Sequence, residues 1–154
     1  VVYEITVTDD SSPWAGSGTE ADPWRITSAA DLVTLREQID AGNSYWGAYF
    51  LMENDISLEE YCGQDKNNWQ PIGNYDGTRL NGTFDGGGHK ITGLYIDSNA
   101  NYQGLFASTW SESTIKNLTV EGFVKGADSV GGITGHSASV IDNCCFRGMT
   151  ISRA

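Results

Sequence analysis

The chain has 154 residues, 39% of them hydrophobic, which fits one domain with a substantial core. Nine basic and twenty acidic residues give a net charge of −11, which opposes binding to nucleic-acid phosphates and to anionic lipid surfaces. No apolar stretch is long enough to cross a membrane, so we expect neither nucleic-acid binding nor membrane insertion. Nineteen glycines, with many Asn, Asp, Ser and Thr, are typical of a turn-rich β protein.

The N-terminal third of the chain predicts a strand, a linker and a cap. Apolar and polar residues alternate over residues 1–8, as in a half-buried strand, and a turn-rich linker completes residues 1–15. Residues 16–48 form the cap, which contains a second short strand near residues 24–27 and a helix near residues 29–41.

This helix carries signals for both of its ends. Ser28 can accept a hydrogen bond from the backbone N–H of Asp31 while the Asp31 carboxylate reaches back, a capping box with Asp in place of Glu. Gly42 suits the left-handed conformation that ends many helices. Three apolar side chains fall on one helix face: Leu32, Leu35 and Ile39.

From residue 49 to residue 154 the pattern is β throughout, and one apolar triplet returns. It recurs 24 residues later and again after a further 26: Ile91-Leu94-Ile96, Ile115-Leu118-Val120 and Ile141-Cys144-Phe146. Residues 104–106 recur as residues 131–133, 27 positions later. Repeats of this length suggest stacked coils of about three strands, about 4.8 Å apart, each burying its inward side chains against its neighbours.

We therefore predict an all-β fold, a parallel β-helix (solenoid) with one N-terminal capping α-helix, forming a single domain over residues 1–154. A stacked coil has an exposed strand edge at each end, and the helix is placed to cover the first. The last triplet is followed within a few residues by Ala154, with no second cap. We expect that the chain is the N-terminal part of a longer protein.

Three cysteines, an odd number, do not make a disulfide framework. Cys144 and Cys145 are adjacent, so a bridge between them would be strained. Cys144 occupies the triplet position that Leu94 and Leu118 occupy, which predicts a buried, small hydrophobic side chain. Cys62 stands apart, and no histidine lies at zinc-ligand spacing from any of the three.

Several blocks, in this order, resemble the repeat region of bacterial surface proteins that carry the GLUG motif. They are Gly-Ser-Gly-Thr-Glu-Ala-Asp-Pro-Trp-Arg-Ile at residues 16–26, Trp-Gln-Pro-Ile-Gly at 69–73, Asn-Gly-Thr-Phe-Asp-Gly-Gly-Gly-His-Lys-Ile-Thr-Gly-Leu at 81–94, Gly-Leu-Phe at 104–106 and Gly-Gly-Ile-Thr-Gly at 131–135. The resemblance spans about residues 16–150. It implies a right-handed parallel β-helix in secreted or cell-surface proteins, often adhesin-like, and it supplies no catalytic residues.

Six aromatic residues lie in polar, turn-like stretches: Trp14, Tyr45, Trp46, Tyr75, Tyr102 and Trp110. Exposed aromatic faces pack against the apolar faces of sugar rings, so these residues are candidates for glycan binding. The alternative is structural, in which the rings close the coil corners and pack the cap.

Other polar groups have structural interpretations as well. Asp85 and His89 could act as orienter and base, but their glycine-rich context indicates a turn with no nucleophile nearby. The acidic loops at residues 53–55 and 76–77 could bind calcium, although neither has a recognised loop spacing. In later coils, two pairs of oppositely charged residues fall at matching positions and resemble solvated charge pairs: Lys116 with Asp142, and Glu121 with Arg147.

The sequence thus favours a non-catalytic extracellular module that binds or displays, with a glycan or a host or bacterial surface protein as partner. Neighbouring domains of the same polypeptide would be further partners. No catalytic or metal residue is assigned. A polysaccharide-active β-helix enzyme, which would need two facing carboxylates, and an inert stalk remain as alternatives.

Overall fold

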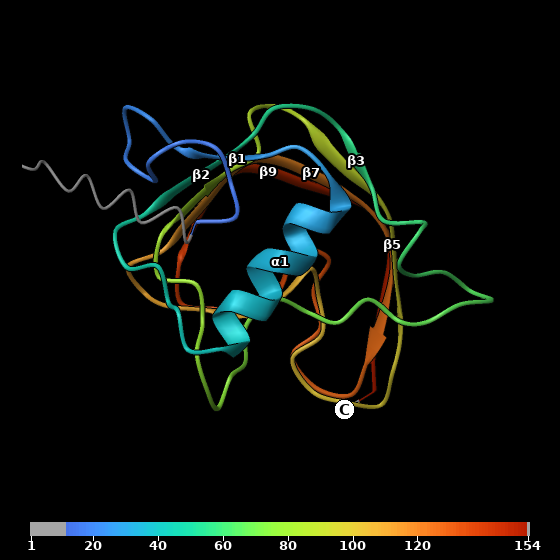
Figure 1. The fold of residues 1–154 in the computed structure, drawn as a ribbon. Coiled ribbons are helices and arrows are strands. Elements are labelled where there is room, and N and C mark those ends of the chain that lie inside the picture. Colours follow the sequence, from blue (N-terminus) through green and yellow to red (C-terminus); the bar gives the residue numbers. More distant parts are fainter. Residues whose placement is uncertain (1–11, 154) are drawn as a thin grey trace, which may run out of the picture.

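The computed structural model describes residues 12–153, so the strand predicted at residues 1–8 lies outside the described residues. The described chain winds into a parallel β-solenoid of about five turns, with one short helix near its N-terminal end (Figure 1). The predicted all-β, parallel architecture is therefore confirmed.

The solenoid has three sides. Five strands stack in parallel on the first side: β1 (Trp24–Ile26), β2 (Tyr49–Met52), β4 (Thr83–Asp85), and the first parts of β7 (Thr114–Gly126) and β9 (Val140–Ser152). The second side stacks β3 (Ile56–Ser57), β5 (Lys90–Asp97) and the later parts of β7 and β9. The third side holds β6 (Phe106–Thr109) and β8 (Thr134–Ser137). Because β1 pairs with β2, the sheet begins inside the segment that the sequence assigns to the cap.

Stacked side chains from successive turns fill the interior. Two of these columns are Phe50, Phe84 and Ile115 on the first side, and Ile56, Ile91 and Val120 on the second. All six are buried, with at most 3% of any of them exposed. Burying a large apolar side chain stabilises a fold by about 1.5–3 kcal/mol, so the columns are the main source of stability.

Helix α1 (Ala29–Asp40) lies across the open end of the solenoid, as the view along the axis in Figure 1 shows. Its apolar face buries Leu32, Leu35 and Ile39 completely. The Ser28 hydroxyl accepts the predicted bond from the Asp31 N–H at 3.2 Å. The Asp31 carboxylate, however, accepts from the Thr27 N–H at 2.9 Å, one residue earlier than the capping box predicts. The helix thus caps the edge as predicted.

One predicted register is wrong and the other is confirmed. Leu118 stands on Cys144, and the whole second step of 26 residues is in register. In the first step, by contrast, Ile91 pairs with Val120, and Ile115 stands on Phe84. The 24-residue echo is a local resemblance, because each triplet contains one residue of positive φ two places after its first member: Gly93, Asn117 and Asn143. The same turn chemistry occurs at different positions around the coil.

The repeat at residues 104–106 is also shifted. Gln103 pairs with Val130, 27 residues later as predicted, but Phe106 pairs with Thr134 rather than with Ile133. One additional residue therefore enters the later turn between these two pairs.

Candidate ligand-binding groove

Two open hollows lie beside α1, where the helix meets the third side of the solenoid. The first has a volume of about 370 Å³ and is bounded by Val33, Tyr61, Asn67 and their neighbours. The second has a volume of about 290 Å³ and reaches Asn101 and Tyr102. Arg36 and Gln70 line both, so we call the two hollows together the α1 groove. Its floor on the third side is joined to the next turn by the bridge between Ile72 and Phe106.

A stack of planar side chains, the aromatic stack, forms one wall of the second hollow and continues beyond it. Tyr75 and Tyr102 lie face to face, with ring centroids 4.1 Å apart and planes 4° from parallel. The Arg79 guanidinium lies 4.6 Å from the Tyr75 ring and 4.5 Å from the Trp110 ring. His136 meets Tyr75 edge-on at 5.0 Å. Tyr75 is therefore covered on both faces, whereas Tyr102 and Trp110 are at the ends of the stack.

Backbone contacts hold this stack rigidly. Arg79 donates from Nε to the Asn74 carbonyl at 3.3 Å and from Nη2 to the Tyr75 carbonyl. Tyr102 has a φ of +59°, a left-handed conformation that is uncommon for a bulky residue and costs on the order of 1–3 kcal/mol. Its N–H donates to the Asp128 carbonyl at 2.9 Å. Partial desolvation, followed by the neighbouring Tyr75 phenol, raises the pKa of Tyr102.

Three side chains of the groove have unused hydrogen-bonding capacity. The Arg36 side chain is only 20% exposed, and its nearest carboxylate oxygen, on Glu37, is 3.9 Å away. Within residues 12–153, neither Arg36 nor Gln70 nor Asn67 makes a side-chain hydrogen bond. Asn68 differs, because its amide both donates to and accepts from the Asp97 backbone at 2.9 Å. The groove thus combines flat rings with open donors and acceptors.

The structure separates the six aromatic candidates into three groups. Tyr75, Tyr102 and Trp110 meet in the aromatic stack, although they are up to 35 residues apart in the chain. Trp46 is 74% exposed but stands outside the groove lining, and its Nε1 donates to Glu112 at 2.8 Å. Of the remaining two candidates, Trp14 belongs to the core and Tyr45 packs against it.

Trp14 is the candidate that the structure corrects most clearly. Only 5% of it is exposed, so its ring cannot present a face to a ligand. It packs against Trp24, Tyr45 and Phe50, with ring centroids 5.3–5.8 Å away. Tyr45 is half-buried in the same cluster, where burial raises its pKa. These two rings pack the capped end of the solenoid, the structural role that the sequence left open.

Sequence reasoning missed Arg36, Arg79 and Tyr61. Arg36 is helical, on a segment recognised only for its apolar face. Arg79 lies in a turn, and no local pattern indicates that it is enclosed between rings from two different turns. The juxtaposition depends on solenoid register, which only the folded chain provides.

The turn expected at Asp85 is present, and one of the two expected charge pairs has a different partner. His89 Nδ1 lies 3.3 Å from Asp55, not beside Asp85. Asp85 instead accepts from the Gly87 N–H and the Asn117 amide, which confirms a turn there. Arg147 forms an ion pair with Glu121 at 3.9 Å, as predicted. Lys116 is in register with Asp142, but it forms its ion pair with Asp85, at 4.0 Å.

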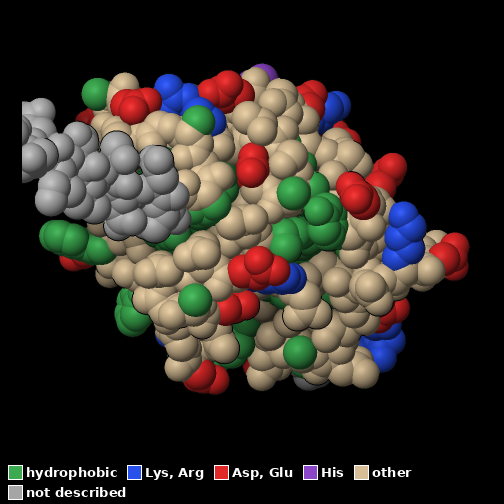
Figure 2. Space-filling view, viewed as in Figure 1, with side chains coloured by type: hydrophobic (Ala, Val, Ile, Leu, Met, Phe, Trp, Pro, Cys, Tyr) green, Lys and Arg blue, Asp and Glu red, His purple; other side chains and the backbone are tan. Residues whose placement is uncertain are grey.

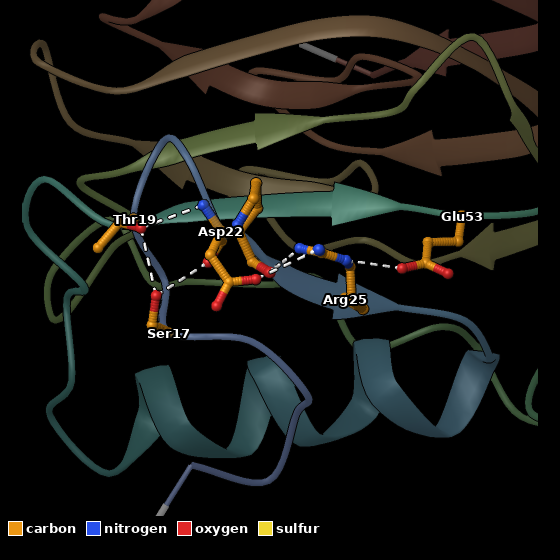
Figure 3. Close-up of polar contacts among 6 residues, drawn as sticks. Ser17, Thr19, Asp22, Arg25 and Glu53 are labelled. Atoms are coloured by element: carbon orange, nitrogen blue, oxygen red, sulfur yellow. Dashed lines mark hydrogen bonds and ion pairs between the residues drawn. The ribbon is translucent and has the colours of Figure 1, made fainter.

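In the acidic loop at residues 53–55, the Glu53 and Asp55 carboxylates contact other groups of the same chain. Glu53 forms an ion pair with Arg25, with Glu53 Oε1 2.7 Å from Arg25 Nε, and Figure 3 shows the Arg25 side chain lying between Glu53 and the Asp22 loop. Asp55 accepts from the Lys90 N–H, the main reason that its pKa is lowered. Residues 12–153 contain no group of three acidic, His or Cys side chains placed to hold a metal ion. Calcium binding stays a prediction.

The three cysteines are free. Cys62 is buried, Cys144 is half-buried on Leu118, and Cys145 is exposed. Burial raises the pKa of the Cys62 and Cys144 thiols. In the part of the chain that the structure describes, no helix has the length and apolar character needed to cross a membrane.

Two proteins are similar to this chain over most of its length. A protein of Evansella cellulosilytica described as a Gly-rich membrane protein is 35% identical over 148 residues, which are 92% of this chain and 16% of that protein. Halomucin of Haloquadratum walsbyi is 31% identical over 149 residues, 92% of this chain and 2% of that protein. No protein-family model and no solved structure matches the chain. The chain therefore spans a small part of the relatives it matches, whose names are consistent with a surface protein.

Proposed function

We propose that this chain is a GLUG-like extracellular surface module that binds carbohydrate non-catalytically in the α1 groove. The observation that carries the proposal is the aromatic stack beside side chains with unused donors and acceptors. Sugars combine an apolar ring face with a rim of hydroxyl groups, so a flat ring beside open amides suits them. Tyr102 offers the ring, and Gln70 and Asn67 offer the hydrogen bonds.

The carboxylates of the groove favour binding over hydrolysis. Glycoside hydrolysis generally requires two carboxyl groups about 5–10 Å apart across the sugar bond. Among the described residues that line the groove, Asp40 alone carries a carboxylate. A polysaccharide-active enzyme would therefore need a second acid from elsewhere.

The comparisons support the surface location. One relative is described as a Gly-rich membrane protein and the other is named halomucin, and both are far longer than this chain. A location at the cell surface, with other domains of one polypeptide as neighbours, fits these relatives and the resemblance to GLUG proteins.

A glycan microarray tests the proposal. We expect the parent chain to bind a subset of glycans, and Tyr102→Ala to reduce that binding by up to about tenfold, since contacts with an aromatic face contribute on the order of 0.5–1.5 kcal/mol and about 1.4 kcal/mol is tenfold. Trp46→Ala is the matched control, because Trp46 is an exposed ring outside the groove. Thermal melting of each variant shows that the fold is retained.

Two outcomes would contradict the proposal. Absence of binding by the parent to any glycan would favour the inert stalk, in which the aromatic stack only joins turns. Formation of new reducing ends or unsaturated products from pectins or mucin glycans would instead favour an enzyme, if the Asp40→Asn variant formed less of these products.

A further inference from the structure

Arg36 stands at the junction of the two hollows, and its guanidinium makes no hydrogen bond to any residue between 12 and 153. A guanidinium has five N–H donors in a planar fork that matches a carboxylate. The side chain is 20% exposed and lines both hollows, and none of its nitrogen atoms is among the buried side-chain atoms that lack a partner in the described residues. Glu37, its recorded ion-pair partner at 3.9 Å, is 64% exposed, and an exposed pair of this kind contributes little.

The other enclosed arginines are used by the protein itself. Arg25 contacts two carboxylates, those of Asp22 and Glu53. Arg79 donates to two carbonyl groups and lies between two rings. Arg36 has no comparable set of partners in the described chain, although its side chain, at 20% exposed, is less exposed than that of Arg25, at 30%. The structural reasons that hold Arg25 and Arg79 do not apply to Arg36.

We infer that Arg36 makes the α1 groove selective for a glycan that carries one acidic sugar, whose carboxylate pairs with the Arg36 guanidinium. This inference rests on the proposed function. Gln70 lines both hollows and would bind a hydroxyl group of the same sugar or the next one. The adjacent sugar would then reach the second hollow and the face of Tyr102.

The charges around Arg36 restrict the ligand further. Asp40, one helical turn after Arg36, lines the second hollow, where it would repel a second carboxylate. The net charge of −11 opposes an extended polyanion, and Figure 2 shows acidic side chains spread around the capped face. The groove is therefore suited to an acidic sugar beside a neutral one, not to a uniform polyuronate.

Calorimetry with three probes tests this selectivity. The probes are a xylo-oligosaccharide bearing one glucuronic acid, its carboxyl-reduced counterpart, and an oligogalacturonate of similar length. We expect the parent to bind the first probe about tenfold more tightly than either of the others, the lower range for a charge-assisted pair in an open groove. Arg36→Gln should bind the first two probes equally, and Arg36→Lys should keep part of the preference.

Arg147→Gln is the matched control, since Arg147 is 70% exposed on β9 and outside the groove lining. It removes the same charge and should leave the preference unchanged. Because the Arg36 side chain makes no hydrogen bond within the described chain, we expect Arg36→Gln to melt at the parent temperature.

The failures of the two ideas differ. Equal binding of the acidic and reduced probes by the parent would overturn the Arg36 inference but leave carbohydrate binding intact. Preference for the oligogalacturonate, or equal competition by a glutamate-rich peptide, would overturn it as well. Absence of binding to all glycans would overturn the proposed function itself.

Discussion

Leu118→Asp tests the stacked core most directly. Leu118 is 1% exposed and lies between two other turns, with Cys144 of β9 on one side. On the other side is Gly86, where a Cβ would come within 2.8 Å of the Leu118 Cα and Cβ. A carboxylate at this place would have no space for water, and the buried residues of the described chain include no Lys or Arg to pair with it.

The expected loss of stability is comparable with the stability of a whole domain. Removing the apolar side chain alone, as in Leu118→Ala, should cost about 2–5 kcal/mol. Burying an unpaired carboxylate adds several kcal/mol, and a typical domain is stable by about 5–15 kcal/mol. We therefore expect Leu118→Ala to fold with a lower urea midpoint, and Leu118→Asp to be unfolded or aggregated.

Urea titration followed by circular dichroism measures both variants. Thr119→Asp is the control, because Thr119 is the next residue of β7 and stands beside the exposed Cys145 on the outer surface. It should change the free energy of unfolding by less than about 1 kcal/mol. A soluble Leu118→Asp protein with the parent's midpoint would refute the position of Leu118 between turns.

Three further predictions follow from close packing, thiol burial and phenol titration. Gly122→Ala should lower the melting temperature by several degrees, because a Cβ at Gly122 would collide with the Leu94 carbonyl oxygen of the preceding turn; an unchanged temperature would mean that β5 and β7 pack less closely. With a thiol-reactive disulfide reagent at pH 8, Cys145 should react first and Cys62 only on unfolding, since burial shields Cys62 and raises its pKa. Equal modification rates of Cys62 and Cys145, measured by mass spectrometry, would contradict this. The raised pKa of Tyr102 means that its stabilising contribution is complete below the ordinary tyrosine pKa of about 10 and is lost as pH rises through the folded-state value; Tyr102→Phe should reduce the alkaline fall in unfolding free energy, and an identical pH profile would contradict the assignment.

Features that depend on neighbouring residues can be read from the amino-acid sequence. The N-cap at Ser28 and the end at Gly42 were predictable because capping uses bonds within one helical turn. The apolar positions Leu118 and Val120 were predictable as core, since inward side chains alternate along a strand. The 26-residue step also held, because no extra corner residue enters between β7 and β9 on the first two sides.

Which residues meet across turns, by contrast, is visible only in the folded chain. Ile91 stands on Val120 rather than on Ile115, because turns differ in the number of corner residues and one apolar pattern occurs at two different corners. The aromatic stack joins Tyr75 to Tyr102 across turns, and Arg36 lines the groove because α1 packs across the end of the solenoid. Side-chain spacing within a strand is local and can be read in the sequence, whereas the pairing of distant turns depends on the packing of the whole coil.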